Sequence, residues 1–308
     1  MSESRILIIF PGALGDLICL LPTIRAISAQ NPGCSVELMA RMELARFAVG
    51  RMGIARAHSI DRPEVGHLFA TSDVDLAAAR RFFGEFVRID AFFAADNDRF
   101  RASLRAIASD VRFYPFRPPS EGHVSSGYLK VIGADEAFAR EAGIEILDED
   151  RAAAAANLER GGLRPGAYLL VLPGSGSRSK NWPADNFLNL IRRFEKEQKT
   201  LVVLGPAEAD IEAVFRDSGV ATCTGLELGE VAALARASRV FIGNDSGVSH
   251  LAAAAGARGL VLFGPSDPVR WRPQGRVEVI RHQPIVELAV HEVEAALRSM
   301  LCDGQNSA

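Results

Sequence analysis

Short apolar runs alternate along this chain with longer segments in which apolar residues recur at helical spacing. Residues Arg5–Phe10 (RILIIF) are apolar and rich in isoleucine, Leu14–Ala29 carries leucines and isoleucines at helical spacing, and Val36–Ala40 is a second apolar run. This order of strand, turn, helix and strand is typical of a βαβ unit in a parallel sheet. We therefore expect the chain to begin with an α/β domain.

The same alternation returns in the second half of the chain. Each apolar run there is followed by glycine or proline and then by a helical pattern, and the runs are Ala167–Leu172, Thr200–Leu204, Arg239–Ile242 and Gly259–Phe263. The pattern predicts two parallel-sheet α/β domains in tandem. Two such domains facing one another would leave a cleft at the carboxyl ends of their strands, where open α/β sheets bind ligands.

The boundary between the two domains is best placed near Leu158–Gly166 (LERGGLRPG). Three glycines and a proline interrupt an alanine-rich helical pattern at this point, and such residues mark breaks between elements. We therefore expect an N-terminal domain over 1–160 and a C-terminal domain over 161–308. The pattern predicts a final helix over Ala289–Leu301 and leaves open whether it packs on the second domain or back on the first.

Composition excludes several classes of protein. The 308 residues are 48% hydrophobic and 24% charged, as in ordinary soluble globular proteins. Acidic residues outnumber basic ones by 38 to 35, so the chain as a whole lacks the positive charge of a nucleic-acid-binding protein. It has neither an apolar run long enough to span a membrane nor the basic stretch and cleavage site of a signal peptide. We expect a cytoplasmic protein, or one peripheral at the cytoplasmic face of the inner membrane.

The spacing of the cysteines is also typical of a cytoplasmic protein. The four cysteines lie far apart without any C-x-x-C pair, at Cys19, Cys34, Cys223 and Cys302. They predict neither a zinc site nor a disulfide framework and suit a reducing compartment.

The first motif that carries chemistry is Phe10–Asp16 (FPGALGD), between the first strand and the first helix. Its glycines, Gly12 and Gly15, allow a ligand or a partner loop to approach the backbone closely. Asp16 has two interpretations: an acid favoured by the helix N-terminus, or a general base at the carboxyl end of the strand. The dinucleotide pattern G-x-G-x-x-G is absent, so Glu37, at about the distance of a ribose contact, is better explained as a strand acid.

The second motif is Pro173–Lys180 (PGSGSRSK), after the first strand of the second domain. Small residues, serine hydroxyls and the cations Arg178 and Lys180 suit a phosphate cradle. The loop does not match the Walker pattern, which argues against ATP hydrolysis. The alternative is a solvated flexible loop, and the Trp182-Pro183 pair that follows argues against free flexibility.

The third motif is Gly243–His250 (GNDSGVSH), between a strand and a helix of small residues. Helix capping by Asp245 or Ser246 could explain one of these residues. The exposed N–H groups of the helix N-terminus could also hold a phosphate oxygen. A hydrolase triad of Ser246, His250 and Asp245 is a weaker interpretation, because the surrounding pattern is not G-x-S-x-G.

The fourth motif, Phe263–Pro268 (FGPSDP), is explained either as a rigid turn or as a wall of the ligand site. Three D-x-D pairs are attributed to solvated acids rather than to a metal site: Asp73/Asp75, Asp96/Asp98 and Asp148/Asp150. The arginine-rich stretch Arg99–Arg117 is explained as a solvated face, or as a docking surface for an anionic acceptor or a membrane. The histidines His58, His67, His123 and His282 are given no role.

Taken together, the motifs resemble those of the heptosyltransferase family (glycosyltransferase family 9), whose members move heptose from ADP-heptose to the lipopolysaccharide core. The matching patterns are G-A-L-G-D-x-x-x-x-L-P over Gly12–Pro22, P-G-S-G-x-x-x-K-x-W-P over Pro173–Pro183, N-D-S-G-x-x-H-L-A-A over Asn244–Ala253 and F-G-P-[ST]-D-P over Phe263–Pro268. Residues 42 to 160 show no such motif.

The resemblance implies a GT-B fold of two Rossmann-like α/β domains around a cleft, and an inverting reaction that needs no metal or cofactor. It implies that the N-terminal domain, with Gly12 and Gly15, takes a lipid-linked or oligosaccharide acceptor and that the C-terminal domain takes ADP-heptose. Asp16 resembles the base that deprotonates the acceptor hydroxyl. Lys180 resembles the cation that offsets charge on the departing diphosphate.

The resemblance also implies a set of residues that bind the nucleotide sugar. By position in the motifs these are the phosphate loop (Ser175, Gly176, Ser177), the loop that grips sugar and diphosphate (Asp245, Ser246, Gly247, His250), and more loosely Glu208 and Leu226 near the ribose and adenine. Two alternatives use the same fold: a nucleotide-sugar epimerase that needs no acceptor, and a non-catalytic nucleotide-sugar-binding protein. The presence of both Asp16 and Lys180 argues against the non-catalytic protein, because binding alone needs no base.

Overall fold

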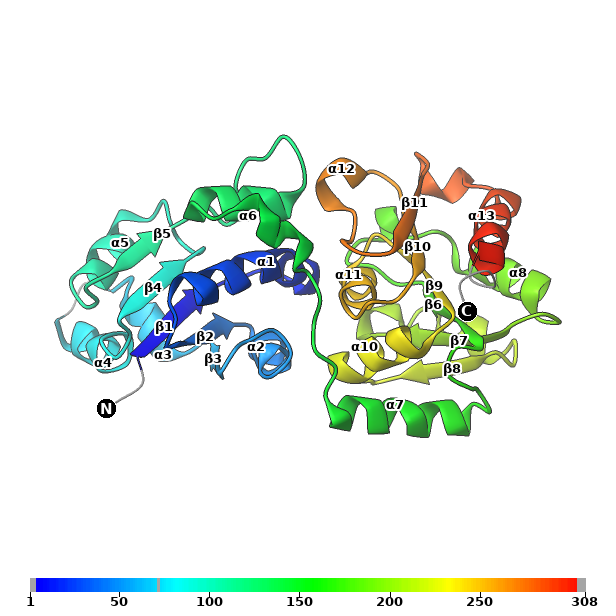
Figure 1. The fold of residues 1–308 in the computed structure, drawn as a ribbon, viewed down its shortest axis with the longest axis horizontal. Coiled ribbons are helices and arrows are strands. Elements are labelled where there is room, and N and C mark those ends of the chain that lie inside the picture. Colours follow the sequence, from blue (N-terminus) through cyan, green and yellow to red (C-terminus); the bar gives the residue numbers. More distant parts are fainter. Residues whose placement is uncertain (1–3, 71–72, 304–308) are drawn as a thin grey trace. The chain divides into compact units, whose positions relative to one another are not determined.

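A computed structural model describes residues 4–70 and 73–303. They form two compact units that divide between Glu145 and Ile146, and each unit is built on one parallel sheet covered by helices (Figure 1). The two-sheet α/β architecture is therefore confirmed.

The first unit holds five strands in the order β3-β2-β1-β4-β5, all paired in parallel. The strands are β1 (Ser4–Ile9), β2 (Cys34–Ala40), β3 (Arg56–Ser59), β4 (Arg88–Ala91) and β5 (Val111–Phe113). The helices are α1 (Leu14–Gln30), α2 (Met42–Ala48), α3 (Pro63–His67), α4 (Asp73–Phe83), α5 (Asp98–Arg105) and α6 (Val124–Ile132), followed by the 3-10 helix η1 (Glu136–Arg140). The strand order reverses between β1 and β4, so the loops after these two strands lie where open α/β sheets bind ligands.

The core of the first unit explains its strand sequences. Leu7 and Ile9 of β1 and Ile89 of β4 are buried in one cluster with residues of α4 and α5, such as Phe83 and Phe100. A sheet covered on both faces needs nearly continuous apolar strands instead of an alternating pattern, which is why RILIIF predicts its strand so well. The edge strands β3 and β5 are short and half-exposed, and no apolar run predicts them.

The second unit holds six parallel strands in the order β11-β10-β9-β6-β7-β8. The strands are β6 (Tyr168–Leu172), β7 (Lys199–Leu204), β8 (Ala221–Thr224), β9 (Val240–Asn244), β10 (Gly259–Phe263) and β11 (Val277–Arg281). The helices are α7 (Asp148–Arg160), α8 (Ala184–Phe194), α9 (Glu212–Arg216), α10 (Leu228–Ala237), α11 (Gly247–Ala254), α12 (Pro268–Trp271) and α13 (Val290–Asp303), with 3-10 helices η2 (Arg178–Lys180), η3 (Pro206–Glu208) and η4 (Ile285–Glu287). Here the order reverses between β6 and β9.

One boundary differs from the expectation drawn from the sequence, and one open placement is decided. The division between the units falls before α7, not after it, because α7 packs on α10 of the second unit. The final helix α13 belongs to the second unit as well. Its buried residues Val293, Leu297 and Met300 join the core cluster of the second sheet.

The helix that carries Asp16 contains a proline. Pro22 lies inside α1, where it lacks a backbone N–H and its ring crowds the preceding turn. Ser125 of α6 donates a hydrogen bond from its hydroxyl to the carbonyl of Cys19 in that turn, at 2.8 Å. This hydrogen bond ties α6 to α1 beside the proline. Helix α6 thereby supports the helix whose first turn carries Asp16.

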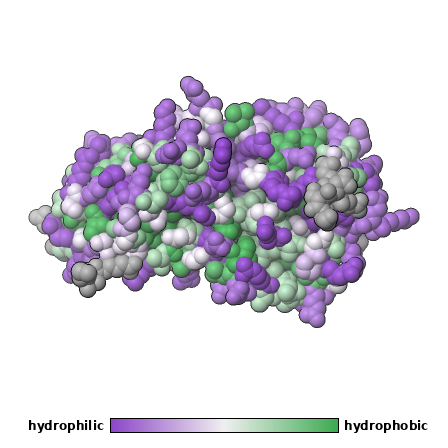
Figure 2. All heavy atoms as spheres, in the orientation of Figure 1, coloured by the Kyte–Doolittle hydropathy of each residue, from purple (hydrophilic) through white to green (hydrophobic). Residues whose placement is uncertain are grey.

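The surface carries no large continuous apolar region on the face drawn in Figure 2, where hydrophilic residues are interspersed with hydrophobic ones over both units. Among the described residues, no helix is both long and apolar enough to cross a membrane. The four cysteines are all free thiols.

Candidate active site

The loop between β1 and α1 is too crowded for any residue but glycine at position 12. A Cβ atom on Gly12 would lie 2.3 Å from the ring of Phe10 and 2.8 Å from the Cβ of Asp16. Such distances are shorter than any real contact, so a larger residue would displace one of these two side chains. Gly12 therefore allows Phe10 and Asp16 to sit close together at the end of β1, and Gly15 follows in the first turn of α1.

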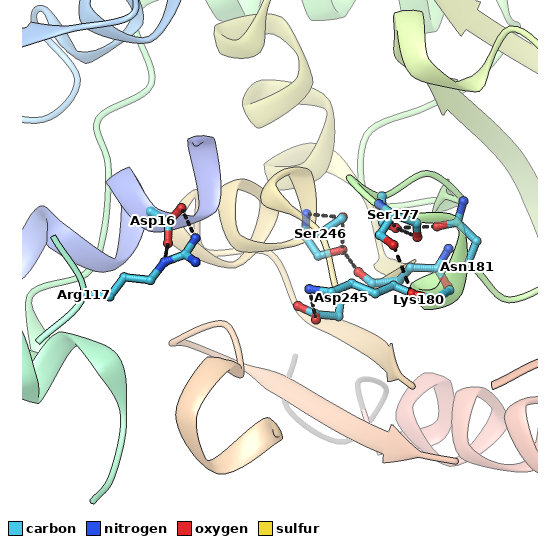
Figure 3. Close-up of polar contacts among 11 residues, drawn as sticks. Asp16, Arg117, Ser177, Lys180, Asn181, Asp245 and Ser246 are labelled. Carbon is cyan, nitrogen blue, oxygen red and sulfur yellow. Dashed lines mark hydrogen bonds and ion pairs between the residues drawn. The ribbon is translucent and has the colours of Figure 1, made fainter. Parts of the chain in front are cut away.

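Asp16 is buried, and all of its recorded contacts are hydrogen bonds that it accepts. The residue is only 6% exposed, and Oδ2 accepts a hydrogen bond from the backbone N–H of Ala13 at 3.3 Å. This contact caps the start of α1, as the structural interpretation of a first-turn acid requires. A second partner comes from far along the chain: Arg117 donates from Nε to Oδ1 at 3.2 Å and from Nη2 to Oδ2 at 3.0 Å (Figure 3).

Arg117 was not among the residues singled out from the sequence. It was grouped with the stretch Arg99–Arg117 as part of a solvated face or an anion-docking surface. Its side chain is 52% exposed, yet it forms a two-pronged ion pair with a buried carboxylate, and hydrogen bonding to Asp16 raises the pKa of Arg117. The two residues are 101 positions apart, so no local pattern could have linked them.

The other four arginines of this stretch also have partners inside the first unit. Arg99 donates to the carbonyl of Ala70, Arg112 pairs with Asp110, Arg101 lies 3.8 Å from a carboxylate oxygen of Asp98, and Arg101 and Arg105 both lie over the ring of Phe113. Each of these arginines thus has an intramolecular contact, and a docking role of the stretch stays a prediction.

At the strand reversal of the second sheet, Asn244 joins the loops that follow β6 and β9. It is fully buried at the end of β9, donates from Nδ2 to the carbonyl of Pro173 at 2.6 Å, and accepts at Oδ1 from the backbone N–H of Trp182 at 3.0 Å. The indole of Trp182 in turn donates to the carbonyl of Leu288 at 2.9 Å. The serine-rich loop is therefore anchored at both ends.

Lys180, at the end of the serine-rich loop, is paired with an acid from the loop after β9. The Nζ of Lys180 lies 2.8 Å from Oδ2 of Asp245, and the Lys180 side chain is 34% exposed whereas that of Asp245 is 5% exposed. Figure 3 shows the two side chains directed toward each other. The structure thus brings together two of the residues that the sequence placed in one site.

The serines between these anchors are hydrogen-bonded to one another. The hydroxyl of Ser175 contacts the amide oxygen of Asn181 and the carbonyl of Ser177, and it accepts from the backbone N–H of Ser177 at 3.2 Å. The hydroxyls of Ser177 and Ser179 lie 2.9 Å apart. Gly176 is exposed at the tip of this turn. Closely spaced hydroxyl and N–H groups of this kind are suited to binding an anion, to which they can donate hydrogen bonds.

Ser246 is the N-cap of α11, which begins at Gly247. Its hydroxyl accepts from the backbone N–H of Ser249 at 3.3 Å, and the Ser249 hydroxyl donates to the carbonyl of Asn244 at 2.7 Å. His250 is buried one turn further on. Asp245 pairs with Lys180 and Ser246 with Ser249, which differs from the relay of a serine hydrolase. Capping explains Ser246, and the positive end of the α11 dipole faces the same loops.

Glu208 and Leu226 follow the next two strands, β7 and β8. The carboxylate of Glu208 accepts from the backbone N–H of Gly205 at 2.7 Å. A Cβ atom on Gly174 would lie 2.1 Å from the Oε1 of Glu208, so the absent side chain of Gly174 makes room for this carboxylate beside the serine loop. Leu226 is half-buried in the loop before α10. Every donor-side residue predicted from the sequence therefore lies at the carboxyl edge of the second sheet.

The loop after β10 borders this edge too. A Cβ atom on Gly264 would lie 3.3 Å from the carbonyl oxygen of Ser179, so the two loops are in close contact. The carboxylate of Asp267 accepts from the backbone N–H of Val269 and caps α12. The interpretation as a rigid turn fits this packing, whereas the role of the loop as a wall of the ligand site stays a prediction.

Comparison with known proteins identifies the family. The family model for glycosyltransferase family 9 (heptosyltransferase) matches residues 134–293. The chain belongs to this family. A curated relative, lipopolysaccharide heptosyltransferase 3 of Escherichia coli, is 30% identical over 114 residues, which span 34% of this chain and 33% of that protein.

Solved structures of family members share the fold over nearly the whole chain. A family 9 glycosyltransferase from Veillonella parvula superposes with a TM-score of 0.80 at 19% identity, covering 98% of this chain and 99% of that one. The E. coli ADP-heptose lipopolysaccharide heptosyltransferase II superposes with a TM-score of 0.74 at 18% identity, with the same coverage. At such identities the likeness shows the fold, so this heptosyltransferase-family chain has the GT-B fold, as the motif resemblance implied.

Several acids and histidines of the family 9 chain have structural roles that the sequence did not reveal. Asp150 is not solvated as expected, because it is buried and accepts from the backbone N–H of Leu147 at the start of α7. His123 caps α6 through the backbone N–H of Ser125, and His58 lies 2.6 Å from the buried Glu37 of β2.

Two of the three D-x-D pairs have side chains that the structure describes. The side chains of Asp73 and Asp75 lie outside the described residues, whereas those of Asp98 and Asp148 are fully exposed. Within residues 4–70 and 73–303, no group of three or more His, Cys, Asp or Glu side chains is placed to hold a metal ion.

Proposed function

We propose that this family 9 glycosyltransferase moves heptose from ADP-heptose to an inner-core lipopolysaccharide acceptor, with inversion at the anomeric carbon and without a metal. The observation that carries the proposal is the pairing of Lys180 with Asp245 where the strand order of the second sheet reverses. A cation, the N-terminus of α11 and a turn of serine hydroxyls meet at this point, and this is the set of groups that a nucleoside diphosphate requires.

The charges of the site suggest how it takes up the donor. The buried Asp245 holds the ammonium of Lys180 at the mouth of the serine loop. A diphosphate carries more negative charge than one carboxylate and competes for the same ammonium. Once Lys180 turns to the diphosphate, Asp245 can accept hydrogen bonds from sugar hydroxyls, with His250 and Gly247 nearby in sequence on α11. Ser175, Gly176 and Ser177 take the phosphate oxygens, and Glu208 and Leu226 take the ribose and adenine.

The bond changes of the reaction follow from these groups. The acceptor hydroxyl oxygen attacks the anomeric carbon on the face opposite the diphosphate, and its proton passes to the carboxylate of Asp16. The bond from the anomeric carbon to the β-phosphate oxygen breaks, and the electron pair leaves with ADP. Lys180 and the α11 dipole stabilise that growing negative charge, which is the task a metal ion performs in other transferases. Gly12 and Gly15 precede Asp16 in the loop proposed to take the acceptor, and Gly12 leaves room there for the side chains of Phe10 and Asp16.

Ligand-dependent melting tests the donor assignment. ADP, UDP, GDP and NAD at equal concentration should raise the melting temperature according to their affinities for the folded protein. We expect selective stabilisation by ADP, and a Lys180→Ala variant should lose most of it. Stabilisation by UDP or GDP instead would replace the donor while keeping the transferase fold.

A transfer assay tests the reaction itself. Release of ADP from ADP-heptose should require the lipid-linked or oligosaccharide acceptor, and the product should have the opposite anomeric configuration to the donor. Turnover should survive treatment with a chelator. Conversion of the nucleotide sugar in the absence of any acceptor would refute the proposal in favour of an epimerase.

A further inference from the structure

The contact between Asp16 and Arg117 involves both oxygens of the carboxylate. Arg117 Nε donates to Oδ1 at 3.2 Å and Nη2 donates to Oδ2 at 3.0 Å. Two parallel N–H···O bonds fix the plane of a carboxylate as well as its position, which one cationic contact cannot do. Figure 3 shows the guanidinium edge facing the two oxygens. The orientation of Asp16 therefore depends on this distant side chain together with the N–H of Ala13.

Arg117 lies against its neighbour Phe116, and Phe116 in turn contacts Phe10 in the Asp16 loop. Its guanidinium carbon lies 5.1 Å from the centre of the Phe116 ring, and that ring lies 5.6 Å from the ring of Phe10 at the end of β1. The hydroxyl of Tyr128 on α6 donates to the carbonyl of Phe116 at 2.9 Å. The segment that carries Arg117 is thus anchored at two points, by Phe10 after β1 and by Tyr128 on α6.

The hydrogen bonds leave the two carboxylate oxygens unequal. Oδ2 accepts from Ala13 N and from Arg117, whereas the recorded bond to Oδ1 is the one from Arg117 Nε. A carboxylate oxygen has two lone pairs, so Oδ2 is saturated and Oδ1 has one lone pair left for a further donor. An incoming hydroxyl would find its acceptor at Oδ1.

We propose that Arg117 is the positioning residue of the catalytic base: it fixes the carboxylate of Asp16 and directs the acceptor proton to Oδ1. This inference rests on the proposed transfer reaction, in which Asp16 takes that proton. Besides giving the buried Asp16 carboxylate a partner, the pair has a value in the reaction. Its value lies in geometry, since a base displaced by about 1 Å can lose on the order of 100-fold in rate.

Substitution of Arg117 tests the role in catalysis. Arg117→Ala should lower kcat by about 100-fold with little change in the KM of the acceptor or of ADP-heptose. Arg117→Lys should recover only part of that loss, because an ammonium cannot form the two-pronged contact. Free guanidinium ion should restore part of the activity of Arg117→Ala and none of that of Asp16→Asn. A raised acceptor KM with normal kcat would overturn the proposal, because Arg117 would then bind the acceptor.

Arg112 provides a matched control on the same segment. It is similarly exposed and forms a two-pronged pair with Asp110 at 3.2 and 3.1 Å, and no proposed step involves it. Arg112→Ala should therefore leave kcat and both KM values unchanged. A loss in this variant equal to that of Arg117→Ala would show that removing any arginine from the segment has the same effect, and would overturn the proposal.

A readout that needs no activity separates this inference from the proposed reaction. Crystals of Arg117→Ala should show the Asp16 side chain turned away from its present position, and an unmoved carboxylate would overturn the positioning role. If the unaltered protein transfers no heptose but Asp16 moves in the variant, the proposed reaction fails while the positioning role stands.

Discussion

The ammonium of Lys180 and the carboxylate of Asp245 lie 2.8 Å apart, although 65 residues of chain separate them. Each comes from a loop after a different strand, and the two strands, β6 and β9, are neighbours in the sheet. Because parallel strands present their carboxyl ends at one edge, the loops of β6 and β9 meet where the strand order reverses. Lys180, proposed to bind the diphosphate, and Asp245, proposed to bind the sugar, are thus directly paired.

Separating this pair should affect both stability and donor binding. Lys180→Ala leaves the carboxylate of Asp245 buried without its cation, and we expect the free energy of unfolding to fall by about 1–3 kcal/mol. The double variant Lys180→Ala with Asp245→Asn should recover part of this stability without recovering the ADP-induced rise in melting temperature. Urea unfolding and thermal shift measure the two effects. Equal ADP stabilisation in the variant and the unaltered protein would contradict the role of Lys180.

Removal of the proposed base should abolish transfer without harming the donor site. Asp16→Asn keeps the shape and the hydrogen-bond acceptor for Ala13 but cannot take up the acceptor proton. We expect kcat to fall by about 100- to 10,000-fold, and the ADP-induced thermal shift to stay unchanged because the donor groups lie in the second unit. Steady-state transfer rates check the first effect. Near-normal turnover in this variant would mean that another group is the base.

A methyl group at position 12 should disturb the Asp16 loop. In Gly12→Ala the new Cβ would overlap the ring of Phe10 and the Cβ of Asp16, and overpacking of this kind costs about 1–3 kcal/mol. Gly66 is a suitable control in the same unit, because a Cβ there meets nothing within 4 Å. Urea unfolding should show a lower midpoint for Gly12→Ala only. A similar loss in both variants would contradict crowding as the cause.

The raised pKa of Tyr114 predicts a loss of stability at alkaline pH. Burial raises the pKa of its hydroxyl from 10.0 to about 12, where it donates to the buried Asp90 at 3.2 Å. Below pH 10 both folded and unfolded forms keep the phenolic proton. Between pH 10 and about pH 12 the unfolded form releases it first, so the free energy of unfolding falls as the pH rises through this window.

The comparison with Tyr114→Phe isolates this contribution. The variant should be less stable near neutral pH, since Asp90 loses a hydrogen bond, but its stability should fall less steeply between pH 10 and about pH 12. Burial also raises the pKa of Tyr168, so the difference between the two curves is the quantity to measure by urea unfolding. Parallel curves would contradict the assignment of the alkaline loss to Tyr114.

Local sequence was sufficient to place most of the candidate site on its elements. The apolar run of β1, the glycines after it and the helical spacing of α1 put Asp16 in the first turn of a helix after a strand, and the structure has it there. The same reasoning placed Lys180 and Asp245 in loops after strands of the second sheet. It succeeds because buried parallel strands are continuously apolar, and because glycine, proline and serine mark the turns that follow them.

Only the tertiary structure decided which of these side chains meet. The partner of Asp16 is Arg117, which follows the short edge strand β5, and no apolar run announces that strand. Asn244 holds the serine loop through Pro173 and Trp182. Periodicity reports which face of an element is buried, whereas contacts between distant residues depend on the strand order and on the packing of the whole unit. The sequence therefore determined the loops that carry the chemistry, and the packed sheets determined how those loops are joined.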